Sequence, residues 1–207
     1  MILYLHKKGY AMDKYELEGE MTDTYRSLTN YLVKKYGPVK YDYFLDESCK
    51  TVNKKNSRTS EGLQIHHKDE NKAIMLSDPE FAIGNPYKYQ KADRLVYCNI
   101  LEHLILHLKI TGDDAFKLKR SNTICGLGGA INFLIPEINS YYAGKLPANP
   151  TKYSVLDENF DSYIMILMDF YYLGFECYWL GKKLSKEKLS RDLDGKIVDK
   201  VYSRLNK

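Results

Sequence analysis

The sequence has no closely spaced cysteine pair and no long apolar run. The absence of a C-x-x-C motif argues against a zinc site built from cysteines and indicates reduced thiols in a cytoplasm. No segment approaches the roughly 20 apolar residues that a membrane-spanning helix needs, and Met1–Leu5 is too short for the core of a signal peptide. We therefore expect a cytoplasmic protein without a membrane partner. The four cysteines are Cys49, Cys98, Cys125 and Cys177.

Tryptophan and net charge are also scarce. The chain has one tryptophan against 19 tyrosines, and its net charge is only +4. An apolar fraction of 44% and a charged fraction of 28% are those of a globular protein and exclude a disordered one. A chain of 207 residues can form one sizeable core, so most tyrosines are expected on half-buried surfaces.

The positive charge is unevenly distributed. Residues 182–207 hold nine Lys or Arg against four Asp or Glu, which gives this tail +5 and the rest of the chain −1. The apolar spacing of the tail fits a helix-turn-helix with a lengthened turn, but it fits a plain amphipathic hairpin more readily. A second basic run could contact nucleic-acid phosphates or be a solvated loop. Its residues are Lys50, Lys54, Lys55 and Arg58.

The periodicity of apolar residues predicts an α+β protein that is mainly helical. The expected helices span 13–36, 99–110, 124–142 and 157–180. Gly37-Pro38 ends the first, Thr111-Gly112-Asp113 ends the second, and Pro136 kinks or splits the third.

Two short strands are expected, at Leu63–His66 and Leu95–Cys98, on either side of an irregular excursion over 68–93. With helix 99–110 they form a ββα unit between N-terminal and C-terminal helices. We divide the chain into a helical and basic-loop region, this ββα core, a second helical region and the basic tail. Their ranges are 1–61, 62–110, 111–181 and 182–207.

Four of the five histidines fall into two tight pairs. His66 and His67 end the first predicted strand, while His103 and His107 occupy positions i and i+4 of the predicted helix. Residues four apart share a helix face, so both imidazoles can reach one ion. A further ligand from a nearby strand would complete a site with open positions, as catalytic metal sites need.

Two other metal sites are weaker alternatives. A structural zinc site usually has four protein ligands, often cysteines, and Cys98 is the only cysteine nearby. A protease-like zinc site needs Glu after its first histidine, whereas Glu102 precedes His103. We expect Glu102 at the surface or behind a ligand, because it points about 100° away around the helix. Asp69 and Glu70 could orient an imidazole.

The strand, histidine pair and helix resemble the HNH, or ββα-metal, nucleases, and among them the variety with three histidine ligands found in colicin nuclease domains. The family has a His-His pair ending the first strand, an Asn nine residues before a helical His, and a last His four residues later. His66-His67, His103 and His107 match this pattern. The resemblance covers residues 62–110, about a quarter of the chain.

The resemblance implies that His66, His103 and His107 bind one divalent ion (Mg, Mn, Zn or Ni) and that His67 is the general base. Imidazole titrates near neutral pH and can take a proton from water. An ion held by neutral ligands keeps its Lewis acidity for the scissile phosphate. The family reaction leaves a 5′-phosphate.

One position departs from the family pattern. The family Asn, which braces the loop of the base, is Arg94 here, and arginine has no acceptor. Arg94 could instead bind the scissile phosphate, with Asp93 or Asn99 as the brace, or the enzyme could be inactive.

We therefore predict a metal-dependent endonuclease of HNH type that hydrolyses double-stranded DNA, in restriction, mobile-element or phage-defence context. Its catalytic residues would be His67 and Arg94. Double-strand cutting with one active site per chain would suggest a homodimer. The alternatives are an RNA-cleaving toxin and a non-catalytic nucleic-acid-binding protein with a metal-stapled fold.

Overall fold

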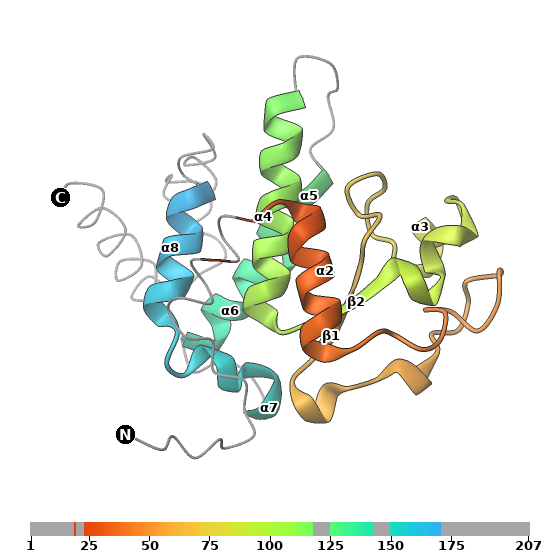
Figure 1. Cartoon of the computed structure of the whole chain (residues 1–207), viewed down its shortest axis with the longest axis horizontal. Coiled ribbons are helices and arrows are strands. Elements are labelled where there is room, and N and C mark those ends of the chain that lie inside the picture. Colours follow the sequence, from red (N-terminus) through yellow and green to blue (C-terminus); the bar gives the residue numbers. More distant parts are fainter. Residues whose placement is uncertain (1–18, 20–22, 118–124, 143–149, 171–207) are drawn as a thin grey trace.

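The computed structural model describes residue 19 and residues 23–117, 125–142 and 150–170 (Figure 1). Within these ranges the protein is mainly helical with one two-stranded sheet, so the expected α+β class is confirmed. The predicted tail 182–207 lies outside the described residues, as do residues 13–18 of the first predicted helix and 171–180 of the last.

The elements alternate long helices with short turns. The helices and strands are α2 Tyr25–Tyr36, β1 Gln64–His67, α3 Pro79–Ala82, β2 Leu95–Cys98, α4 Ile100–Lys117, α5 Cys125–Gly129, α6 Ile135–Tyr142, α7 Pro150–Tyr153 and α8 Phe160–Phe170. Short 3₁₀ turns cover Lys54–Asn56, Thr59–Glu61, Tyr87–Gln90, Ala92–Arg94 and Ser154–Leu156.

The sheet pairs β1 with β2 in antiparallel register, with Gln64 opposite Cys98 and His67 opposite Leu95. β2 has the predicted bounds, and β1 starts and ends one residue later than predicted. Residues 68–94 between the strands contain only the one-turn helix α3 and two short 3₁₀ turns, in keeping with the irregular excursion that the sequence indicates. β2 leads directly through Asn99 into α4, and this junction places the end of β1 beside the first turns of the helix.

A capping box starts α4. The Asn99 side chain accepts hydrogen bonds from the backbone N–H of Leu101 and Glu102, and the Glu102 carboxylate accepts one from the Asn99 N–H at 2.6 Å. The predicted end of this helix at Thr111 is wrong, because α4 continues to Lys117. Thr111 is buried and its hydroxyl donates to the His107 carbonyl, so packing keeps this segment helical despite its weak propensity.

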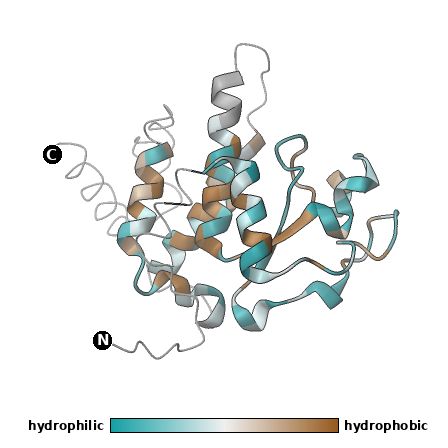
Figure 2. Ribbon diagram, in the orientation of Figure 1, coloured by the Kyte–Doolittle hydropathy of each residue, from teal (hydrophilic) through white to brown (hydrophobic). Residues whose placement is uncertain are grey.

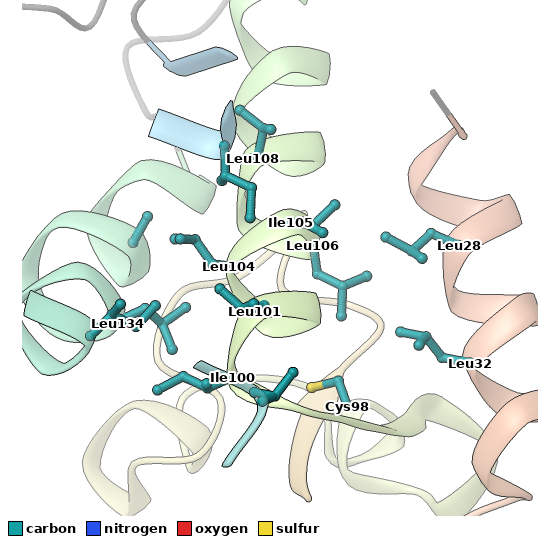
Figure 3. Close-up of a cluster of buried hydrophobic side chains, with 14 of the residues drawn as sticks. Leu28, Leu32, Cys98, Ile100, Leu101, Leu104, Ile105, Leu106, Leu108 and Leu134 are labelled. Atoms are coloured by element: carbon teal, nitrogen blue, oxygen red, sulfur yellow. The ribbon is translucent and has the colours of Figure 1, made fainter. Parts of the chain in front are cut away.

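The core surrounds α4, which contacts α2, α5 and α8 (Figure 1). Figure 3 shows Leu28 and Leu32 of α2 facing one side of α4 and Leu134 facing the other. All three are buried, as are the apolar residues of α4 between them. Each fully buried leucine stabilises the fold by about 1.5–3 kcal/mol. Figure 2 shows apolar residues along α4 and α8, and mostly hydrophilic segments beyond the sheet.

Residues 125–142 continue as α5, a π-helical turn over Ala130–Leu134, and α6. Proline lacks the N–H that would bond back along the helix, and the π turn lies just before Pro136. The predicted irregularity at this proline is thus present as a change of helix type.

No helix among the described residues is long and apolar enough to cross a membrane. In the same part of the chain, Cys49, Cys98 and Cys125 are free thiols.

Candidate metal centre

Four side chains from three elements converge at the junction of β1 and α4. His66 comes from the end of β1, Glu70 from the turn after it, and His103 and His107 from α4. One nitrogen or oxygen atom of each lies within 4.8 Å of those of the others. The imidazole centroids are 5.1 Å apart for His66–His103 and His103–His107, and 5.5 Å apart for His66–His107.

In each imidazole of the group, one ring nitrogen faces away from the other ligands. This outer nitrogen lies within hydrogen-bond distance of an oxygen atom. The Gly126 carbonyl can only accept, so His107 Nδ1–H donates to it at 2.8 Å. His103 Nδ1 lies 3.0 Å from Gln64 Oε1, which accepts in the same way. Such contacts behind metal-binding imidazoles set the tautomer and leave the second nitrogen free as a ligand.

Tyr25 holds the outer nitrogen of His66. Its hydroxyl oxygen lies 2.8 Å from His66 Nε2, and its O–H donates to the His67 carbonyl at 3.4 Å. Burial raises the pKa of Tyr25, so the phenol keeps its proton. The tyrosine oxygen therefore accepts from His66 Nε2–H, which leaves His66 Nδ1 with a lone pair.

The inner atoms face the Glu70 carboxylate. Glu70 Oε2 lies 3.3 Å from His107 Nε2 and 3.5 Å from His66 Nδ1. His66 Nδ1 is buried and has no hydrogen-bond partner. Buried acceptors that point at one another without a shared cation or proton are costly. One proton on His107 would satisfy one of these contacts, whereas a divalent ion would satisfy all of them.

The pKa shifts favour neutral imidazoles at His66 and His103 beside an ionised carboxylate. Burial lowers the pKa of His66 to about 3, and burial and the neighbouring His66 lower the pKa of His103 well below its ordinary value. Burial raises the pKa of Glu70, but the adjacent imidazoles of His66, His107 and His67 outweigh it and lower the pKa well below the usual range. Neutral imidazole and ionised carboxylate are the forms that bind metal.

The residues fit a divalent ion of zinc-like size. Bonds of ~2.05 Å from a tetrahedral ion place its ligands ~3.3 Å apart, close to the two contacts of Glu70 Oε2. Because the ligand atoms lie up to 4.8 Å apart, some side chains would move inward, by no more than about 1 Å. The main observation that supports this fit is the Nδ1 atom of His66, which is buried and has no hydrogen-bond partner. The expected metal site is thus shown as a group that could hold an ion, with Glu70 added to the three predicted histidines.

The centre is mostly enclosed. His66 is fully buried, and the side chains of His107 and Glu70 are 8% and 14% exposed. His103 is half-buried. Solvent therefore reaches the group past Glu70 and His103.

His67 lies beside the group with its own fixed orientation. The Gln90 side chain donates from Nε2 to the Leu76 carbonyl, so its Oε1 accepts from His67 Nε2–H at 2.8 Å. This leaves His67 Nδ1 as an acceptor, 3.6 Å from Glu70 Oε1 and without a hydrogen-bond partner. The predicted base therefore presents a lone pair toward the same carboxylate as the histidine group.

Arg94 braces the turn that carries Glu70. Its guanidinium donates from Nε and one terminal nitrogen to the two oxygens of buried Asp69, each at 2.7 Å, and Lys72 also donates to Asp69. Arg94 therefore supports this turn as a hydrogen-bond donor. Asn99 caps α4 and makes no hydrogen bond with the turn, whereas a bracing role for Asp93 stays a prediction. A contact of Arg94 with phosphate stays a prediction.

Glu102 is neither exposed nor beside the metal group. Its carboxylate is fully buried and accepts from Lys35 at 2.7 Å and from the Tyr36 hydroxyl at 2.8 Å, in addition to capping α4. The expectation of a surface residue is wrong, because Lys35 and Tyr36 of α2 cover this face of the helix. Glu102 instead joins α2 to α4.

The predicted phosphate-contacting residues lie in the loop before β1, and they differ in their surroundings. Lys50, Lys54 and Lys55 are exposed. Arg58 donates to the Tyr36 carbonyl and to Glu61 and packs over the Tyr97 ring, so its guanidinium holds the loop against α2 and β2. Contact of these four residues with nucleic acid stays a prediction.

Several residues of the centre were missed as ligands or supports from the sequence. Glu70 had a local signal, because it follows His66 by four residues in a tight turn. Tyr25, Gln64 and Gly126 had none, since they meet the histidines from other elements.

Gly129 is needed for a close approach. A Cβ there would lie 2.2 Å from Cε1 of the His107 ring. The absence of a side chain at Gly129 therefore allows α5 to pack directly against His107.

Comparison with known proteins gives no relative. No family model matches the chain, and neither a curated protein nor a solved structure does.

Proposed function

We propose that the protein is a metal-dependent endonuclease of HNH type that hydrolyses phosphodiester bonds in DNA. The observation that carries the proposal is the convergence of His66, His103, His107 and Glu70, with their lone pairs turned inward, next to His67. Two antiparallel strands followed by a helix present these residues in the order that the family resemblance requires.

His67 would act as the general base. Gln90 holds its Nε2–H and so keeps Nδ1 free to accept a proton. A water molecule beside Nδ1 would transfer its proton there as its oxygen attacks phosphorus, and the bond from phosphorus to the 3′ oxygen would break. The products would be a 5′-phosphate and a 3′-hydroxyl.

The ion would be held by His66 Nδ1, His107 Nε2, the inner nitrogen of His103 and Glu70. When bound, it supplies Lewis acidity for the phosphate and for the departing 3′ oxygen. Three imidazoles favour zinc or nickel by affinity, while the carboxylate and substrate oxygens also suit manganese and magnesium. Tyr25, Gln64 and Gly126 would keep the imidazoles in the ligating tautomer.

The fourth donor favours a second candidate function. Glu70 would complete a four-ligand site, and structural metal sites are typically closed in this way. His67 is also fully buried. These features fit a nucleic-acid-binding protein in which the ion only stabilises the junction of β1 and α4.

Replacement of His67 separates the two candidates. Chelator-stripped protein is incubated with plasmid DNA and with an RNA control, and Mg, Mn, Ni or Zn is added back. If the proposal holds, metal restores nicking, and His67→Ala lowers the cleavage rate by about 100-fold or more while zinc still binds as in the wild type.

A matched variant tests the support of the base. Gln90→Ala removes the acceptor that orients His67 without touching the ion, so we expect a smaller loss of cleavage. Cleavage of RNA alone would make the protein a ribonuclease. Absence of cleavage with every metal, together with zinc-dependent stabilisation, would support the metal-staple candidate. Cleavage unaffected by His67→Ala would exclude His67 as the base.

A further inference from the structure

The segment between the two strands forms a basic pocket beside the metal centre. Its volume is about 360 Å³. It is lined by Asp69, Lys72, Lys88, Tyr89, Lys91, Asp93 and Arg94. These residues come from the turn after β1 and from the chain that leads into β2.

Cationic groups exceed carboxylates in this pocket by four to two. Arg94 and Lys72 share the single buried charge of Asp69, and Lys91 pairs with Asp42 outside the pocket. Lys88 makes no ion pair among the described residues. The side chains of Lys72 and Lys91 are 52% and 47% exposed. The pocket thus holds positive charge that a solvent-borne anion can reach.

Tyr89 brings two of these charges together. The ammonium groups of Lys72 and Lys88 each lie 5.7 Å from the centroid of its ring. A cation near an aromatic face is attracted to it without being neutralised. The ring therefore gathers two ammonium groups at one wall of the pocket while leaving their charge available.

The pocket and the metal centre share one turn. Asp69 lines the pocket and the next residue, Glu70, belongs to the metal group, so their Cα atoms are ~3.8 Å apart. Arg94 locks this turn through its paired bonds to Asp69. A nucleic-acid strand advances ~3.4 Å per nucleotide along the helix axis, so one strand can reach both places within a few nucleotides.

We propose that this pocket binds a backbone phosphate of the DNA strand that is cut, a few nucleotides from the scissile bond. The inference rests on the proposed function for the identity of the ligand. Lysines bind phosphate as mobile point charges, which suits a sequence-independent contact. The pocket therefore holds the strand in position over the metal centre.

The test is the salt dependence of binding to a labelled DNA duplex, measured by fluorescence anisotropy in chelator so that nothing is cut. Lys72→Gln/Lys88→Gln removes two pocket charges. Lys34→Gln/Lys40→Gln removes two exposed charges at the end of α2 and just beyond it, neither of them a predicted phosphate contact, and is the matched control. Each phosphate-contacting lysine contributes about 1 to the slope of log K against log salt, so we expect the pocket pair to lower the slope by about 2 and the control pair to leave it unchanged.

Two single variants sharpen the test. Lys88→Gln should lower the slope by about 1, and Lys88 makes no ion pair in the described part of the chain, so the substitution breaks none there. Asp93→Asn removes a repelling carboxylate from the pocket and should tighten binding. Thermal melting checks that every variant is folded.

The proposal would be overturned if the pocket double variant had the same salt slope as the wild type, or if both double variants lowered the slope equally. Dependence on the pocket for an RNA strand but not for DNA would overturn the assigned ligand. The binding assay contains no metal, so it is independent of cleavage. If the protein binds DNA through the pocket but never cuts plasmid DNA, the proposed nuclease activity is disproved and the proposed phosphate site is retained. If the protein cuts DNA but the pocket variants leave the salt slope unchanged, the nuclease activity is retained and the phosphate site is disproved.

Discussion

The two halves of the metal centre are held in place by different forces. His103 and His107 stand on α4, whose other buried residues are mostly apolar, so packing positions them (Figure 3). His66 and Glu70 stand at a strand end and in a turn. Their positions depend on polar contacts with Tyr25 and on the Arg94–Asp69 ion pair.

This difference separates stability from function. The helical half belongs to the core, so loss of its apolar side chains should destabilise the whole protein. The turn half lies at the edge of the core, and damage to it should alter the site while the fold persists. Three predictions test this contrast, from the largest expected effect to the smallest.

Truncation of Leu104 should produce the largest loss of stability. Leu104 is fully buried next to His103 and faces the core. Leu104→Ala should lower the free energy of unfolding by about 2–5 kcal/mol, because it removes apolar contacts and leaves a cavity. Urea denaturation in chelator measures this value. Ile83→Ala, at a side chain that is 58% exposed, should change it by about 0.5 kcal/mol or less. Similar losses for both variants would contradict the central role of α4.

Addition of one methyl group at Gly129 should damage the helical half without unfolding it. The Cβ would displace the His107 ring, whose Nδ1 would lie 2.7 Å away, and Gly129→Ala should weaken zinc binding by about 10–100-fold. Gly128→Ala is the control, because its Cβ would meet its nearest atom at 3.9 Å. Isothermal titration calorimetry measures both affinities. Equal affinities for the two variants would show that His107 does not depend on this packing.

Acid should weaken the metal-free protein through His66. Its pKa is about 3 in the folded protein, because of burial, against about 6.5 when unfolded. Between these values only the unfolded chain takes up the proton, so stability is full above pH ~6.5 and falls as pH decreases toward 3. At pH 5 the loss from this one group is about 2 kcal/mol.

Urea midpoints between pH 7.5 and 4.5, in chelator, measure this loss. His66→Asn should show a shallower pH dependence than the wild type, since it has no imidazole to protonate. An equally steep dependence would exclude His66 as the source. Saturating zinc should oppose the acid effect, because ligand binding stabilises the folded state.

Local patterns predicted the histidine-bearing elements well. β2 has its predicted bounds, β1 is displaced by one residue, and α4 begins within one residue of its predicted start. The errors arose where tertiary packing overrode a local signal. Thr111-Gly112-Asp113 did not end α4 because a buried turn contacts α5, and Glu102 was not exposed because α2 covers it. Both depend on residues far away in the chain.

The sequence by itself determined that His103 and His107 would share one face of a helix, because the i, i+4 spacing is a local feature. Only the tertiary structure decided what surrounds them. Glu70 reaches the group because Arg94, at the start of the other strand, holds its turn, and Tyr25 sets the tautomer of His66 from 41 residues away. Local sequence encodes the angle between neighbouring side chains. The distance between separate elements depends on how the whole core packs.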